Sequence, residues 1–305
     1  MFHTPPPHVD LAREIPEFGA LARTTVRLHP RRGEGAIGES KIGGAISWPS
    51  SEEWPICTEH DCPFVAVLQL RAADVPELGF PQGTDLFQLL WCPNDHENAR
   101  PLYAPSAKIY WRRNSGIRSY LAAPSSPTAS AAQSDYIPRP CILHPERVIE
   151  FPDIYDLAED RADLVEKLKK SKAVSDVPES YPCEFDESDA EGCEDIYQSS
   201  LSVADGLKVG GYPYWIQYPE WPQCECGHRM DYLLTVASAE FDGGTWFRWL
   251  AREDRANGKF WDADFETRRA VQSAAGLMLG DMGNINYFIC RRCQPWPIEG
   301  VFQCS

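Results

Sequence analysis

The chain has 305 residues, 43% of them hydrophobic, which is enough for more than one folding unit and a substantial core. Its 45 acidic and 29 basic side chains give a formal net charge of −16, and no run of basic residues is longer than two. This distribution argues against nucleic acid and anionic membranes as partners, because phosphate binding depends on clustered Lys and Arg, and it favours a basic protein.

The first ten residues lack the charged and apolar regions of a secretory signal, and no window approaches the roughly eighteen apolar residues of a membrane span. We therefore expect a cytoplasmic protein. Eleven cysteines in a reducing compartment are not expected to form a disulfide framework. Metal ligation becomes the leading explanation for those cysteines that cluster.

Residues 1–40 are expected to form an N-terminal extension. A short helix over residues 11–21 is interrupted by Pro16, and residues 25–29 alternate as a strand does. The glycines that follow favour a loop.

Residues 41–57, KIGGAISWPSSEEWPIC, are echoed by KVGGYPYWIQYPEWPQC at residues 208–224. Eight of the seventeen aligned positions are identical, including both tryptophans and the final cysteine. Such self-similarity predicts an internal duplication. We assign repeat unit one to residues 41–122, a connecting segment to 123–206 and repeat unit two to 207–305.

Each repeat unit is expected to contain two buried strands. They cover residues 64–70 and 86–91 in unit one, and residues 232–237 and 285–290 in unit two. A helix over residues 264–274 lies in an insertion between the second pair.

The connecting segment is more varied in composition. Residues 124–135 are small and polar and predict a surface loop, whereas residues 141–152 read as extended. A helix with Asp156 as its N-cap should follow, since Leu157, Leu164 and Leu168 fall on one face. The acidic run at residues 175–195 is typical of a solvated linker.

These elements predict an α+β fold that is mostly β. Two pseudo-symmetric halves, each with a bent antiparallel sheet, pack together.

Unit two contains two pairs of cysteines at its strand ends. Cys224 and Cys226 lie two residues apart, and Cys290 and Cys293 follow the last predicted strand. Four thiolates complete a closed, tetrahedral structural zinc site. His228 and Cys304 are nearby residues that could replace one ligand, and buried free cysteines are the alternative.

The duplication indicates where unit one would bind a second metal ion. Cys57 aligns with Cys224 and Cys92 with Cys290, and a one-residue slip places His60 and His96 opposite the other two ligands. The set Cys57, His60, Cys92 and His96 would form a Cys2His2 zinc site. Cys62 competes with His60, and loss of the metal from unit one is the alternative, so we expect one zinc ion and consider two.

Aromatic residues occupy equivalent places beside prolines in the two units. Trp54 and Trp221 are expected in the core. Four others are candidates either for core packing or for a surface that binds an extended partner: Trp48, Tyr212, Tyr214 and Trp215.

The sequence contains no phosphate-binding loop and none of the common metalloprotease or hydrolase motifs. No catalytic residue is therefore assigned. A binding module is the first hypothesis, and an enzyme acting on a small molecule in the cleft between the two halves is the alternative.

The repeated KxGGxxxW…WPxC run, the strand LQL at residues 68–70, WCP at Trp91 and GDMGNINYFIC followed by CxxC resemble the YwqG-like bacterial proteins. That family resembles the eukaryotic programmed-cell-death-protein-2 group, whose members act as chaperones for a ribosomal protein. The resemblance implies binding of a protein or peptide, in a chaperone-like or toxin-immunity role. It does not imply a metal, because the family includes metal-free members.

Overall fold

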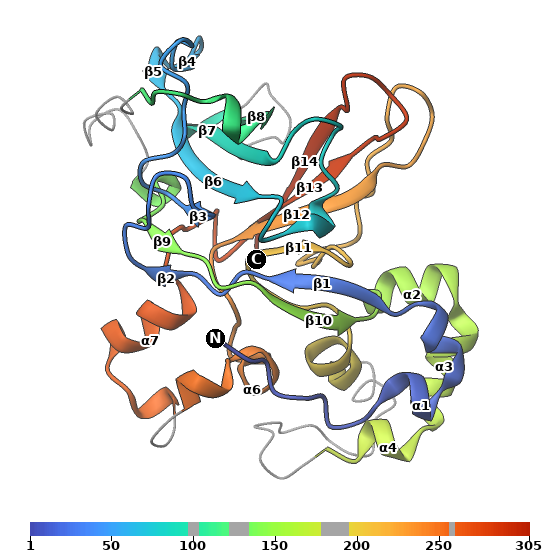
Figure 1. Cartoon of the computed structure of the whole chain (residues 1–305). Helices are drawn as coiled ribbons and strands as arrows, with labels where there is room; N and C mark the ends of the chain where they lie inside the picture. Colours follow the sequence, from blue (N-terminus) through green and yellow to red (C-terminus); the bar gives the residue numbers. More distant parts are fainter. Residues whose placement is uncertain (97–103, 122–133, 178–194, 256–259) are drawn as a thin grey trace.

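The protein is mostly β, with fourteen strands in three antiparallel sheets among the residues that the structure describes (Figure 1). The α+β class expected from the sequence is confirmed. The small polar run and the acidic run of the connecting segment lie largely outside the described residues. This computed structural model describes residues 1–96, 104–121, 134–177, 195–255 and 260–305.

Two six-stranded sheets form the body of the molecule. In spatial order, sheet 1 contains β2 (Arg31–Arg32), β9 (Cys141–Ile142), β3 (Lys41–Ile42), β6 (Val65–Arg71), β7 (Leu86–His96) and β8 (Ala104–Arg112). Sheet 2 contains β10 (Glu146–Glu150), β1 (Arg23–Arg27), β11 (Lys208–Gly210), β12 (Asp231–Ala237), β13 (Asn284–Ile289) and β14 (Ile298–Gln303). A separate hairpin is made of β4 (Ile56–Cys57) and β5 (Cys62–Pro63).

Four neighbouring strands follow the same order in both sheets. The series β3-β6-β7-β8 in unit one has its counterpart in β11-β12-β13-β14 of unit two, and every pair is antiparallel. The second strand of each series carries a register shift against the third, between Ala66 and Leu68 in unit one and between Tyr232 and Leu234 in unit two. Bulges of this kind bend a sheet.

The two halves also share side-chain hydrogen bonds. Gln88 Nε2 donates to the carbonyl oxygen of Ser47 over 2.9 Å, and Asn286 Nδ2 donates to that of Tyr214 over 3.0 Å. Ser47 and Tyr214 are aligned positions of the repeated sequence. Such matched contacts agree with a duplication, which stays a prediction.

The segments outside the two repeat units contribute strands to both sheets. The N-terminal extension supplies β2 to sheet 1 and β1 to sheet 2, and the connecting segment supplies β9 and β10 in the same way. A buried ion pair joins the connecting segment to unit two, since Lys208 Nζ lies 3.0 Å from both carboxylate oxygens of Glu150. These segments are therefore integral to the fold.

One hydrophobic core contains side chains from both sheets. Unit one contributes buried residues such as Leu68 and Trp91, and unit two contributes Leu234 and Ile285. Satellite clusters around Trp48 and around Trp215 are separate from this core. The two sheets thus form a single folded body, because each sheet supplies part of the same hydrophobic core.

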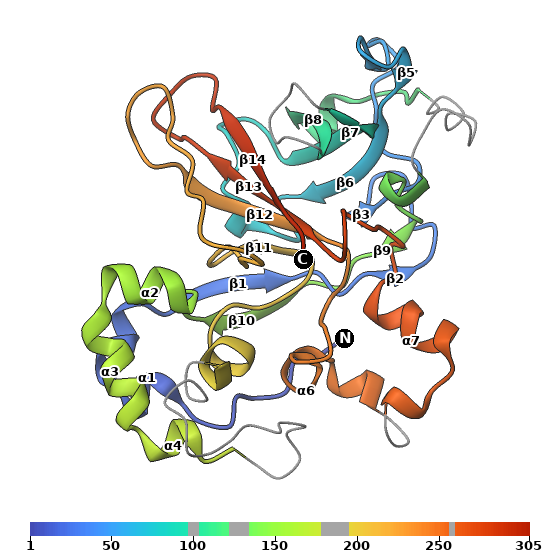
Figure 2. The same ribbon diagram turned by 180° about the vertical axis from the view of Figure 1, so that it is seen from behind.

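The helices lie on the side of β1 and β10 away from β6–β8, in two groups (Figures 1 and 2). One group contains α1 (Leu11–Glu14), α2 (Ile154–Asp160), α3 (Ala162–Lys170) and α4 (Lys172–Ser175), and the other contains α6 (Trp246–Trp249) and α7 (Phe265–Gln272). Short 3-10 helices are η1 (Pro16–Ala20), η2 (Pro76–Leu78), η3 (Asn114–Gly116), η4 (Ser134–Tyr136), η6 (Arg252–Arg255) and η7 (Phe260–Asp262), and Tyr197–Leu201 is a π-helix. In the described part of the chain, no helix has the length and apolarity needed to cross a bilayer.

The helix expected to start at Asp156 is different in the structure. Asp153 is the N-cap, accepting a hydrogen bond from the Tyr155 amide, and the helical run divides at Arg161 into α2 and α3. The Asp156 carboxylate instead accepts hydrogen bonds from two indoles of unit two. By contrast, the interruption at Pro16 and the helix after Asp264 are confirmed.

Candidate metal centres

The four cysteines of unit two come together from two loops at one end of sheet 2. Cys224 and Cys226 lie in a tight turn, in which the Cys224 amide donates to the His228 carbonyl and the Gly227 amide donates to the Cys224 carbonyl. Gly227 has a φ of 81°, which a residue with a side chain rarely adopts. Cys290 and Cys293 belong to the loop between β13 and β14, beside that turn in Figures 1 and 2.

The sulfur geometry of this set fits one four-coordinate metal ion. The Sγ atoms of Cys224 and Cys293 are 3.7 Å apart, as are those of Cys226 and Cys290, and all four lie within 4.8 Å of one another. Tetrahedral coordination with metal–sulfur bonds of about 2.3 Å places sulfurs about 3.8 Å apart, whereas a disulfide requires about 2.05 Å. The four thiols are therefore free of disulfides and are placed so that they could hold one metal ion.

His228 supports this set from outside. The Arg292 guanidinium donates to His228 Nε2, so the ring proton is on Nδ1, which donates to Cys226 Sγ over 3.4 Å. This hydrogen bond lowers the pKa of Cys226 to about 6. His228 therefore stabilises a thiolate and is not a member of the four-ligand set.

The candidate set of unit one is also brought together. Cys57 and His60 belong to the β4–β5 hairpin, and Cys92 and His96 belong to β7. His60 Nδ1 lies 3.7 Å from Cys57 Sγ and 3.5 Å from Cys92 Sγ, and His96 Nε2 lies 3.8 Å from Cys57 Sγ. These separations are the edges of a small tetrahedron of two sulfurs and two nitrogens.

The one-residue slip between the two sets has a local cause. In the unit-one hairpin the backbone of Cys57 lies opposite that of Cys62, whereas in unit two the Cys224 amide donates to the His228 carbonyl. The unit-one turn is therefore one residue longer. Cys62 thus occupies the position equivalent to His228. Its Sγ lies 3.7 Å from Cys92 Sγ, but Cys62 is outside the set of four, so His60 takes the place for which it competed.

Two neighbouring polar residues position the unit-one ligands, and sequence reasoning missed both. The Glu59 carboxylate lies 3.0 Å from His96 Nδ1, which leaves Nε2 directed toward Cys57. Asn94 Nδ2 lies 3.6 Å from Cys92 Sγ. A carboxylate that holds a ligating histidine is common around metals. In the sequence, the feature that could have indicated this role for Glu59 is its position next to the candidate ligand His60.

The close packing of the donors affects how the thiols of both sets ionise. Burial raises the pKa of Cys92 to about 12, and hydrogen bonding to Cys226 raises that of Cys293 to about 12. Closely packed thiols without a cation resist ionising together. A divalent cation would favour the thiolate form that metal ligation requires.

The remaining described cysteines lie elsewhere. Cys304 is beside Gly280 and Gly283 and is outside the unit-two set, so it does not replace a ligand. Cys141 is buried in the main core. The nine cysteines within the described ranges are all free of disulfides.

Three of the four aromatic residues that the sequence left open between core packing and a partner surface are buried, namely Trp48, Tyr212 and Trp215, which favours core packing for them. Trp48 packs against Trp54 and donates to the Glu52 carbonyl, and the Trp215 indole donates to Asp156. The hydroxyl of Tyr212 donates to the Leu21 carbonyl.

Tyr214 is half-buried, and its carbonyl is held by Asn284 and Asn286. The tryptophans of the repeat build the satellite clusters beside the metal sets.

A family model described as "Domain of unknown function (DUF1963)" matches residues 40–292, so the chain belongs to this family. The YwqG-like resemblance is consistent with it. A search of curated proteins found no match. The matched range contains the whole unit-one set and three of the four unit-two cysteines, ends one residue before Cys293, and supplies no activity.

Proposed function

We propose that this DUF1963 protein is a protein- or peptide-binding module whose two halves are each held by a structural zinc ion. The observation that carries the proposal is the closure of both four-ligand sets. Cys224, Cys226, Cys290 and Cys293 form one set, and Cys57, His60, Cys92 and His96 form the other.

Zinc is the metal that fits these donors. Sulfur and imidazole ligands in tetrahedral sets of four are characteristic of structural zinc, whereas carboxylate and carbonyl oxygens favour magnesium or calcium. Four protein ligands leave no coordination position for an activated water. The role of such an ion is to stabilise the fold.

The unit-two metal set also organises contacts between the halves. Arg291, between two of its cysteines, donates to the carbonyl oxygens of Leu78 and Gly79 in unit one, each over 2.8 Å. Its guanidinium lies 4.9 Å from the ring centroid of Trp296. An ion bound by Cys290 and Cys293 would therefore fix a loop that joins the two halves.

A cleft beside this loop supplies a place for a partner. It has a volume of about 660 Å³ and lies between β8 of sheet 1 and the β13–β14 region of sheet 2. The net charge of −16 favours a basic partner. A chaperone-like or toxin-immunity role, as the family resemblance implies, is the form of binding we propose.

A small-molecule enzyme using the same cleft is the second candidate, and the cleft itself is the observation that favours it. Acid–base catalysis needs a group that titrates near neutral pH. Asp205 and Glu240 have their pKa values raised to about 7 by burial, but they do not line the cleft. Burial raises the pKa of Tyr287, which does line it. The binding module is accordingly the better-supported function.

The test combines metal content with partner capture. Protein purified without added zinc should contain two equivalents by elemental analysis, and one equivalent would restrict the proposal to unit two. Immobilised protein at modest salt should retain a reproducible partner, and an Ala107→Trp variant, which fills the cleft, should lose it. Absence of zinc, or absence of a partner together with turnover of a metabolite, would overturn the proposal.

A further inference from the structure

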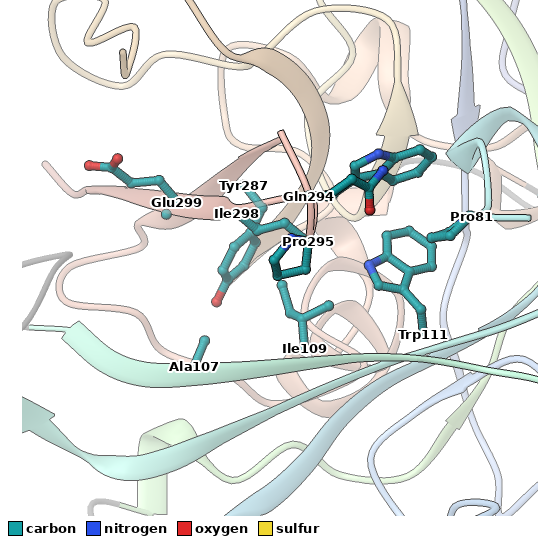
Figure 3. Close-up of a pocket in the computed structure, with 11 residues that line it drawn as sticks. Pro81, Ala107, Ile109, Trp111, Tyr287, Gln294, Pro295, Ile298 and Glu299 are labelled. Atoms are coloured by element: carbon teal, nitrogen blue, oxygen red, sulfur yellow. The ribbon is translucent and has the colours of Figure 1, made fainter. Parts of the chain in front are cut away.

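The cleft between the two halves has mainly apolar and aromatic walls (Figure 3). Ala107, Ile109 and Trp111 of β8 form one wall, and Tyr287, Pro295 and Ile298 lie opposite. Pro81 and Trp296 complete the apolar lining. Two sheets and a loop that follows a candidate metal ligand therefore build this site jointly.

Two polar atoms in the lining have no hydrogen-bond partner. They are Trp111 Nε1 and the Tyr287 hydroxyl, both shielded from solvent. Only 2% of the Tyr287 side chain is exposed, and its hydroxyl points toward β8 in Figure 3. A buried polar group without a partner costs about 1–3 kcal/mol, so a ligand atom that accepts a hydrogen bond from either group would be stabilised.

Five other indoles among the described residues each donate a hydrogen bond. Trp48, Trp54 and Trp91 donate to backbone carbonyls, while Trp215 and Trp221 donate to Asp156. Trp249 also has an unpaired indole nitrogen, but it is buried in a helical cluster and does not line the cleft. Trp111 is thus an unpaired donor in the lining of the cleft.

The chemistry of these two groups restricts the occupant. An indole N–H donates only, and a phenol can donate, so a ligand must offer hydrogen-bond acceptors. The apolar walls disfavour any donor that would be left unpaired. Proline residues meet both conditions, because their carbonyls accept, they have no N–H and their rings are apolar. In a polyproline II helix these carbonyls form no internal hydrogen bonds.

We propose that the cleft binds an extended, proline-rich peptide segment whose carbonyl oxygens accept hydrogen bonds from Trp111 and Tyr287. The proline rings pack against Trp111, Trp296 and Pro295. Aromatic grooves recognise such segments because little conformational entropy is lost when a preformed polyproline II helix binds. This inference rests on the proposed binding function and specifies the class of partner.

The charge of the protein selects among proline-rich segments. The whole chain carries a formal net charge of −16. An arginine next to the prolines would be attracted by this negative charge. We expect a peptide that combines consecutive prolines with an adjacent Arg, and binding that weakens with salt.

The test is a titration of the full-length, zinc-replete protein with a synthetic ten-residue peptide containing four consecutive prolines followed by Arg. A matched peptide has alanine in place of every proline. Isothermal calorimetry should show binding of the first peptide and at least ten-fold weaker binding of the second.

Two variants each remove one donor and keep an aromatic ring. Trp111→Phe and Tyr287→Phe should each weaken binding by about two- to ten-fold, since each loses one hydrogen bond. Tyr287→Phe should not lower the unfolding midpoint, because the hydroxyl that it removes has no partner in the free protein. Tyr232→Phe is the matched control: its hydroxyl bonds to Thr235 outside the cleft and its affinity should equal that of the wild type.

Equal affinities for the two peptides, or unchanged affinity in both donor variants, would overturn the proposal. The proposal would also be overturned if Ala107→Trp released a captured partner whose bound segment lacked proline. The binding function would then remain intact. If the wild-type protein retains no partner at all, the binding function itself fails. The two failures are therefore distinguishable.

Discussion

Replacing Cys290 by alanine tests whether the unit-two cluster holds a metal ion. The Cys290 side chain is 3% exposed, and its Sγ lies 3.7 Å from that of Cys226. If zinc is bound, Cys290→Ala removes one of four ligands and leaves two buried or half-buried thiols without a cation. If no metal is bound, the same change removes only a buried sulfur atom.

The expected magnitudes of these two outcomes differ widely. Structural zinc contributes on the order of 10 kcal/mol to the folding of small units, which is comparable to the whole stability of a domain. We expect Cys290→Ala to lose at least about 5 kcal/mol and its unfolding midpoint to fall by at least about 10 °C. A cavity alone would cost about 1 kcal/mol.

The matched control is Cys141→Ala. Cys141 is also buried, at 1% exposure, but it is outside both metal sets and its thiol contacts the Arg139 carbonyl. Its loss should cost about 1 kcal/mol whether or not the protein binds zinc. Both variants and the wild type would be compared by denaturant unfolding and by zinc content per chain.

The reasoning is refuted if Cys290→Ala and Cys141→Ala lose the same small stability and the wild type contains no zinc. A strong chelator should, on our account, lower the stability of the wild type toward that of Cys290→Ala and have little further effect on the variant.

Three further changes test other parts of the structure. Glu59→Gln should weaken metal binding at unit one by about 10- to 100-fold, because His96 loses its positioning carboxylate; competition with a chromophoric chelator measures this, and an unchanged affinity would remove Glu59 from the site. Asp205→Asn should stabilise the protein above pH 7. Burial raises the pKa of Asp205 to about 7, so the wild type loses stability as the pH rises from about 4 through 7, by up to about 4 kcal/mol. Urea unfolding at pH 5 and pH 8 checks the sign, and a variant that gains nothing at pH 8 contradicts it. Lys208→Met should cost about 3–5 kcal/mol because it leaves the Glu150 carboxylate buried without its cation, and Lys208→Met combined with Glu150→Gln should recover part of that loss.

Residues close together in sequence were the most predictable part of the fold. The strands beginning at Val65, Leu86, Asp231 and Asn284 follow from continuous apolar runs, and the break at Pro16 follows from proline geometry. Both metal sets could be assigned from cysteine spacing and the repeat, since the second copy indicated the positions to search in the first.

Features that depend on distant partners could not be predicted. Asp156 was expected to cap a helix because its local sequence favours this, but two tryptophans about sixty residues further on recruit its carboxylate. Trp48 and Trp215 are buried because one particular face of each loop packs against the sheet. The spacing of residues in the sequence does not specify which face does so. The cleft has the same origin, because β8 and the residues around Pro295 meet only in the folded chain.

The placement of β1 inside sheet 2 constrains how the chain can assemble during synthesis. This strand pairs with β10 on one side and with β11 on the other, so residues 23–27 lie between residues 146–150 and residues 208–210. A strand made near the start of translation must keep both edges unpaired until much of the polypeptide has left the ribosome. The Arg23–Arg27 strand has an arginine at each end, and charged side chains discourage aggregation of an open edge. Sheet 2 therefore closes late, and nascent chains that have not yet reached residue 208 should associate with folding assistants until β11 is made.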